Sequence, residues 1–190
     1  MNDFNLYFSI GWKHIISTDA LDHILFVMAL AAIYLLRDWK KVLILVTAFT
    51  LGHSLTLALS VYDVIRMNAS LVELLIPITI LITAVFNLFQ KDFSPRNLRL
   101  NYFFALFFGL IHGMGFANSI RFMLAKDDSI GWPLFSFNLG LEAGQVLVVF
   151  VILSLAWLLV SKLNLPRKIW VYLISIPAII VSLQMIFERG

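Results

Sequence analysis

Four histidines are the residues of this chain best suited to chemistry. They are His14, His23, His53 and His112, and the chain contains no cysteine. Without cysteine there can be no disulfide, no thiolate metal site and no cysteine nucleophile. Imidazole combined with carboxylate suits borderline divalent metals such as nickel, zinc or cobalt. The residue types therefore favour a divalent metal ion bound by nitrogen and oxygen.

Carboxylates and neutral polar residues occur near these histidines at helical spacing. Asp22 directly precedes His23. Asn138 and Gln145 lie four residues before and three residues after Glu142, which places all three on one face of a helix. The candidate metal ligands are His14, Asp22, His23, His53, His112 and Glu142, with Thr50, Thr56, Asn138 and Gln145 as supporting polar residues. No residue is assigned a catalytic role.

The elements that carry these residues are strongly apolar. Of 190 residues, 61% are hydrophobic and only 13% are charged, whereas about 25% of a soluble domain is charged. Apolar stretches long enough to cross a bilayer recur along the chain. We expect an all-α, polytopic bundle of transmembrane helices that forms a single integral membrane domain over residues 1–190, with the lipid bilayer as its main partner.

Six spans are predicted, preceded by a short aromatic segment at 4–18 that contains Gly11 and Lys13. This segment is expected to be interfacial or re-entrant. The six predicted spans are 21–36, 41–62, 69–89, 101–124, 133–160 and 169–187.

The basic residues predict the orientation. Nine of the fourteen lie in the connections between spans 1 and 2, 3 and 4, and 5 and 6, which the positive-inside rule places in the cytoplasm. We therefore expect an inner (cytoplasmic) membrane protein with both termini outside. The net charge of +3 reflects these basic loops and does not indicate nucleic-acid binding.

Depth along the spans predicts one common polar site. His53 lies about 18 Å along its outward-running span, and His112 lies near the midplane of its own. The ionisable residues thus occupy the outer half, while the inner half has Asn87 as its main polar residue. A single histidine in a span is explained by an interhelical hydrogen bond. Four histidines with carboxylates at similar depth predict that His23, His53, His112 and Glu142 converge.

Two glycine pairs flank these polar residues. Gly109 and Gly113 flank His112, and Gly140 and Gly144 flank Glu142, at the small-xxx-small spacing of closely packed membrane helices. The same glycines would leave room for a ligand.

Four segments resemble the signature blocks of the HupE/UreJ membrane proteins, in family order. They are HIISTDALDHILF at 14–26, FTLGHSLTLA at 49–58, FGLIHGMGFA at 108–117 and FNLGLEAGQ at 137–145. The last block resembles the branch with an F-N-x-G-x-E-x-G-Q pattern. Ala20 departs from the glycine that many members have two residues before the Asp-His pair.

The resemblance implies a permease for nickel or another divalent metal, with the six candidate ligands at the polar motif positions of the family. The family is associated with hydrogenase and urease gene groups, so a homo-oligomer or a metalloenzyme-maturation partner is an open expectation. From the residues alone, two alternatives remain. One is an intramembrane metal-dependent hydrolase, although no H-E-x-x-H signature is present. The other is a structural or assembly subunit of a membrane complex.

Overall fold

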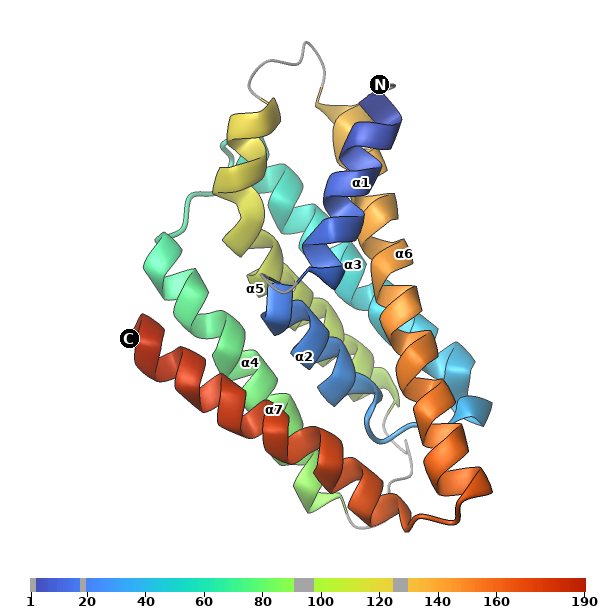
Figure 1. Ribbon diagram of the computed structural model, residues 1–190. Helices are drawn as coiled ribbons and strands as arrows, with labels where there is room; N and C mark the ends of the chain where they lie inside the picture. Colours follow the sequence, from blue (N-terminus) through green and yellow to red (C-terminus); the bar gives the residue numbers. More distant parts are fainter. Residues whose placement is uncertain (1–2, 18–19, 91–97, 125–129) are drawn as a thin grey trace.

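The computed structural model describes residues 3–17, 20–90, 98–124 and 130–190, with only the backbone described at 98–100, 117–119 and 121–124. Every secondary-structure element in these ranges is a helix, and short connections join them, which confirms the expected all-α class (Figure 1). The helices are α1 (Asp3–Ile16), α2 (Leu21–Ala31), α3 (Trp39–Val61), α4 (Ala69–Phe89), α5 (Leu98–Leu124), α6 (Gly131–Ala156) and α7 (Arg167–Arg189). A 3₁₀ turn at Leu36–Asp38 precedes α3, and a π-helical turn at Trp157–Lys162 extends α6.

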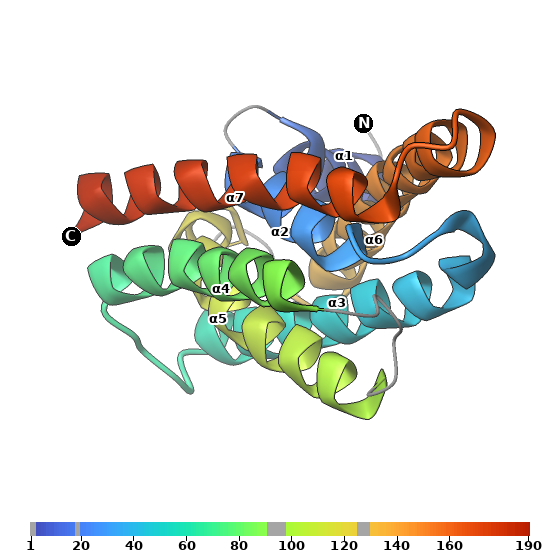
Figure 2. The same ribbon diagram turned by 90° about the horizontal axis from the view of Figure 1, so that it is seen from below.

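The helices pack chiefly in pairs around a central short helix. The closest pairs are α3 with α5, α1 with α6, and α4 with α7. Helix α2 contacts α4, α6 and α7, and seen from below it lies between α7 on one side and α3 and α5 on the other (Figure 2). Large apolar side chains cover the outside, among them Phe89 and Phe187, which are 78% and 84% exposed. An apolar exterior of this kind fits a bilayer, where lipid solvates it.

Four helical stretches are long and apolar enough to cross a membrane: Leu36–Val61, Ala69–Phe89, Gly131–Lys162 and Arg167–Arg189. A fifth span is available if α1 and α2, which meet at a 66° bend, are taken together. Within α5 the fully described part, Asn101–Phe116, is apolar but shorter. The count of six spans therefore stays a prediction.

The first predicted span, 21–36, is wrong as an independent helix. Helix α2 has 11 residues, about 16 Å, and cannot cross a hydrocarbon core of about 30 Å alone. Helix α1 precedes it from one end of the molecule, so α1 and α2 together form either one broken span or a re-entrant segment (Figure 1).

Two side chains from distant helices bind backbone carbonyls at the carboxyl end of α2 and just beyond it. Asn87 donates its Nδ2 hydrogen to the carbonyl oxygen of Ala29 at 2.7 Å, and Arg167 donates to the carbonyl oxygen of Ile33. A helix that ends inside a bilayer leaves carbonyls without partners, and such groups are costly in lipid. These bonds give Asn87, the polar residue of the predicted inner half, a structural role.

The ends of the bundle differ in charge. One end, which we call the basic end, carries Arg37, Lys40, Lys41, Lys162 and Lys168. The connection between α3 and α4 and the last residue, Gly190, lie towards the opposite end (Figure 1). The expected cytoplasmic loops at 37–41 and 162–168 therefore share one end of the fold, while Lys91 and Arg96 lie outside the described residues.

Glycines allow the helices that carry histidines to pack backbone to backbone. A Cβ on Gly109 would collide with the carbonyl oxygen of Phe49, and one on Gly113 with the carbonyl oxygen of His53. Likewise, a Cβ on Gly140 would collide with the carbonyl oxygen of Phe8 in α1. The predicted small-residue contacts thus join α5 to α3 and α6 to α1.

Candidate metal centre

Three histidines from three helices meet beside the bend between α1 and α2. One ring nitrogen from each of His14, His23 and His53 lies within 4.8 Å of the corresponding nitrogens of the other two. Among the described residues this is the only set of three or more histidine or acidic side chains so arranged. The His112 ring lies beside this set, with its centroid 5.2 Å from that of His23. The four rings therefore form one group, which we call the histidine cluster.

The histidine cluster contains ring nitrogens that are buried without a hydrogen-bond partner. They are Nε2 of His14, Nε2 of His23, both ring nitrogens of His53 and Nδ1 of His112. His53 is fully buried and His112 is 1% exposed. Buried polar atoms normally have partners, because leaving them unpaired costs free energy. Several unpaired nitrogens converging on one place fit a cation that imidazole can bind.

Asp22 orients the ring of His23. Its Oδ1 atom lies 2.9 Å from Nδ1 of His23 and also accepts the backbone N–H of His23 at 2.8 Å. A carboxylate can only accept, so Nδ1 of a neutral His23 carries the hydrogen. The lone pair is then on Nε2, which is one of the unpaired nitrogens. Carboxylates hold metal-binding histidines in the same way in many proteins.

Thr79 of α4 orients His112 by contacting its Nε2 atom, whereas Asp22 contacts Nδ1 of His23. The Thr79 hydroxyl donates to the carbonyl oxygen of Ile76 at 2.7 Å, and its oxygen lies 3.0 Å from Nε2 of His112. Since the hydroxyl hydrogen is already used, Nε2 of His112 donates to Thr79. The lone pair of His112 is therefore on Nδ1, again one of the unpaired nitrogens.

A cavity of about 400 Å³ leads to the histidine cluster. It is lined by buried His112 and His23 at its deep end and by Glu73, which is exposed, and Arg189 towards the surface. Arg189 donates to the carbonyl oxygen of Glu73 at 3.2 Å, which joins α7 to α4 there. We call this the histidine cavity. It opens away from the basic end, on the side that the sequence predicts to be outside.

Aromatic rings pack around the cluster. The Phe116 ring lies 4.0 Å from that of His14 and is stacked on Phe137, centroid to centroid at 5.2 Å. Phe49 lies 5.1 Å from His112 on the side away from the cavity. These rings give the cluster apolar surroundings, which strengthen any charge interaction made there.

The carboxylate of Glu142 does not join the histidine cluster. It accepts a hydrogen bond from Thr47 at 2.8 Å, and Gln145 on the same face accepts one from Thr50 at 2.7 Å. The predicted shared face of α6 is therefore used to bind α3. Thr47 precedes His53 by six residues, about 9 Å along α3, which explains why a carboxylate held there is not beside the histidine.

The other supporting residues have local roles. Thr56 donates to backbone carbonyl oxygens of its own helix, at Gly52 and His53. Asn138 has a buried Oδ1 without a partner. Thr79 was missed because a lone threonine in an apolar helix carries no signal. Only its contact with His112, 33 residues away, reveals its role.

Comparison with known proteins identifies the family. No curated protein and no solved structure matches this chain significantly. The family described as HupE / UreJ protein matches residues 1–189. The four motifs that carry the resemblance lie within that range, and three of them supply the histidine cluster. The chain therefore belongs to the HupE/UreJ family.

Proposed function

We propose that this protein is a permease for a divalent transition-metal cation of the nickel type and that the histidine cluster binds the cargo. The observation that carries the proposal is the convergence of His14, His23 and His53, with nitrogens within 4.8 Å of one another and without hydrogen-bond partners. The family is associated with uptake of nickel and cobalt. Both metals are bound well by imidazole.

Each part of the histidine cavity has a task in this proposal. The carboxylate of Glu73 at the surface attracts cations, and the imidazoles replace water around the ion as it moves inwards. Asp22 orients His23 and offsets part of the positive charge of the cargo. His112 is the deepest ligand, held by Thr79.

The broken first span gives the site a means of release. His14 lies near the end of α1 and His23 near the start of α2, so the two ligands belong to different halves of the bent pair. Discontinuous helices with ligands at the break are a recurring feature of transporters. A change in the angle between α1 and α2 separates His14 from His23 and weakens the hold on the ion.

A metal-dependent hydrolase remains the second candidate because of one observation. The histidine cavity ends at His112 against Phe26 and Phe49, and an enzyme needs access from one side only. Three protein nitrogens with an open position would suit a catalytic zinc ion.

Uptake into vesicles tests the permease directly. Purified protein is reconstituted, and entry of Ni²⁺ is followed with an enclosed metal-sensitive dye. Wild type should take up the ion, and His53→Asn, which keeps a side chain of similar shape, should not. Ser182→Ala is the matched control, because it also changes a buried polar residue but lies in α7, where its hydroxyl binds Ala178. Bound metal without uptake in wild type would contradict the permease and favour the hydrolase.

A further inference from the structure

The mouth of the histidine cavity carries two charges of opposite sign. Glu73 of α4 and Arg189 of α7 both line it, and Arg189 is the only lysine or arginine among its described lining residues. A fixed positive charge repels a bare divalent cation, so the permease function alone does not explain Arg189. The two charges together suit a molecule that has a positive part and a negative part.

The guanidinium of Arg189 has hydrogen-bond donors that the protein does not use. Its Nη1 atom donates to the carbonyl oxygen of Glu73 at 3.2 Å, which holds the side chain at the mouth. Among the described residues no carboxylate forms an ion pair with Arg189, and the neighbouring Glu188 accepts a hydrogen bond from Gln184 instead. Arginine carries five N–H donors in a planar fork, and a carboxylate can bind two of them at once. The mouth therefore offers a place for a carboxylate.

The histidine cavity is larger than a hydrated metal ion requires. Its volume is about 400 Å³. A shell of six waters, at about 30 Å³ each, occupies about 180 Å³. Cavities of about 300–1,000 Å³ are typical of sites that bind small organic molecules. The size therefore leaves room for an organic molecule beside the ion.

The distance from the mouth to the deep end also suits such a molecule. Arg189 contacts the backbone of Glu73, and Thr79, six residues further along α4, contacts His112. Six residues of helix rise by about 9 Å. A metal–nitrogen bond measures about 2 Å and a charge-assisted hydrogen bond about 2.8 Å, so one ion cannot contact both ends. A molecule of a few atoms, which binds the ion at one end and presents a carboxylate at the other, fills this distance.

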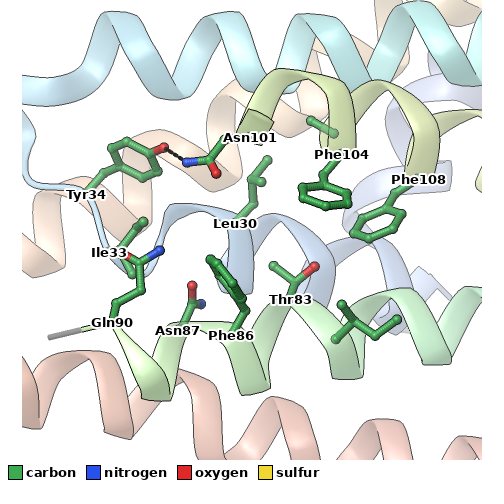
Figure 3. A pocket seen from close by; sticks show the side chains of 12 residues that line it. Leu30, Ile33, Tyr34, Thr83, Phe86, Asn87, Gln90, Asn101, Phe104 and Phe108 are labelled. Carbon is green, nitrogen blue, oxygen red and sulfur yellow. Dashed lines mark hydrogen bonds between the residues drawn. The ribbon is translucent and has the colours of Figure 1, made fainter. Parts of the chain in front are cut away.

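A second cavity lacks these features. It has a volume of about 110 Å³, lies between α2, α4 and α5, and is lined mainly by apolar side chains (Figure 3). Its polar lining residues are all neutral, namely Tyr34, Thr83, Asn87, Gln90 and Asn101. It offers no counter-charge to a metal complex, so such a complex belongs in the histidine cavity.

From these observations we infer that the histidine cavity receives its metal as a complex with a small carboxylate chelator, such as a hydroxycarboxylic acid, and that Arg189 binds a carboxylate of the chelator. This inference rests on the proposed permease function. The carboxylate stays at the mouth with Arg189 while the ion points towards the histidine cluster. The imidazoles then replace the oxygen atoms of the chelator around the ion, since nickel-type cations suit imidazole. The chelator leaves by the mouth.

The test uses citrate as the chelator. Uptake of Ni²⁺ into vesicles is measured with and without citrate at the same concentration of free Ni²⁺. Wild type should take up Ni²⁺ faster with citrate, and Arg189→Gln should lose about 10–100-fold of this citrate-dependent uptake, the effect of removing a charged hydrogen-bond partner. Arg66→Gln is the matched control, because Arg66 lies at the same end of the bundle, pairs with Asp63 and is not a lining residue of the cavity.

Binding of radiolabelled citrate to purified wild type gives a second measurement that needs no variant. Citrate should bind when Ni²⁺ is present and not when it is absent, since the ion links the chelator to the imidazoles. No Ni²⁺-dependent citrate binding, or equal Ni²⁺ uptake with and without citrate, would overturn this inference and leave the proposed function standing. Citrate-dependent uptake that persists in folded Arg189→Gln would also overturn it. Wild type that takes up no Ni²⁺ in either form would overturn the proposed function and this inference together.

Discussion

At the scale of single residues, two hydrogen bonds select which nitrogen of each histidine is available. Asp22 accepts a hydrogen bond from Nδ1 of His23, and the Thr79 hydroxyl oxygen accepts one from Nε2 of His112. The two rings thus offer opposite nitrogens, although both belong to one cluster. Removal of the group that hydrogen-bonds the other ring nitrogen of a metal-binding histidine commonly lowers metal affinity by about 10–100-fold.

Thr79→Val should weaken Ni²⁺ binding by about tenfold or more, because His112 then loses the acceptor that keeps its lone pair on Nδ1. Thr79→Ser should restore binding, since the hydroxyl is retained. Titration calorimetry measures the affinity, and the visible absorption of bound Co²⁺ reports the loss of a nitrogen ligand. Equal affinity and an equal Co²⁺ spectrum in wild type and Thr79→Val would show that Thr79 does not position His112.

Asp22→Asn should also lower the affinity, by about 10–100-fold, because an amide holds the imidazole of His23 less firmly and carries no charge. The control is Asp63→Asn, an exposed change in the connection between α3 and α4. Asp63 has a φ of 62°, which asparagine tolerates, so its fold should be unaffected. Competition with a chelating dye measures both variants, and a similar affinity for the two would contradict the role of Asp22.

The sequence was sufficient to select the residues of the site, but not to predict which groups their side chains contact. Histidine and aspartate at membrane depth are rare and costly, which made His14, Asp22, His23, His53 and His112 visible. Glu142 was equally visible, yet its carboxylate binds Thr47. Whether it also contributes to metal binding stays a prediction. The partner of a polar side chain depends on which neighbouring helix packs against its face. Periodicity within one helix does not predict that neighbour.

At the scale of helices, close backbone packing brings the histidines together. Gly113 lies next to His112 and touches the backbone of His53, so the α3–α5 contact fixes the separation of two cluster residues. Pairing of α1 with α6 through Gly11 and Gly140 holds His14 in the same way. The glycine spacing in the sequence predicted close packing at the pairs in α5 and α6, but neither the helices that they meet nor the part played by Gly11.

Gly113→Ala should therefore damage the site. The added Cβ meets the carbonyl oxygen of His53 and must push α3 and α5 apart, at a cost of about 1–3 kcal/mol for overpacking. Gly131→Ala is the matched control, because a Cβ there meets nothing within 4 Å. The melting temperature and the Ni²⁺ affinity should both fall in Gly113→Ala. Neither should fall in Gly131→Ala. Unchanged affinity in Gly113→Ala would show that the helix separation does not control the cluster.

The early end of α2, at Ala31, shows where helix prediction fails. The run LDHILFVMALAAIYLL contains no glycine or proline, so the sequence gives no reason for α2 to end at Ala31. The reason lies 58 residues away, where Asn87 binds the carbonyl oxygen of Ala29. Tertiary partners of this kind can override local propensity.

At the scale of the whole molecule, the histidine cavity and the basic residues lie towards opposite ends of the bundle. Glu73 and Arg189 line the outer part of this cavity, away from the basic end. If the basic end is cytoplasmic, as the positive-inside rule predicts, the histidine cavity opens to the outside, where uptake begins.

Labelling of single cysteines tests this orientation. Lys162→Cys lies at the basic end and Met67→Cys, at a residue that is 48% exposed, lies at the opposite end. An impermeant maleimide added to intact cells should label Met67→Cys, and Lys162→Cys only after the membrane is opened. The reverse pattern would place the histidine cavity on the cytoplasmic side and turn the proposed uptake into export.

The central claim is that the histidine cluster binds a divalent cation, and the metal content of purified protein tests it most directly. Wild type, His14→Asn, His53→Asn and Ser182→Ala are equilibrated with Ni²⁺ by dialysis and analysed for metal and protein, with circular dichroism to verify the fold. We expect about one tightly bound ion per chain in wild type and Ser182→Ala and little in either histidine variant, because each loses one of the three converging nitrogens. Full metal content in both folded histidine variants, or none in wild type, would contradict the account.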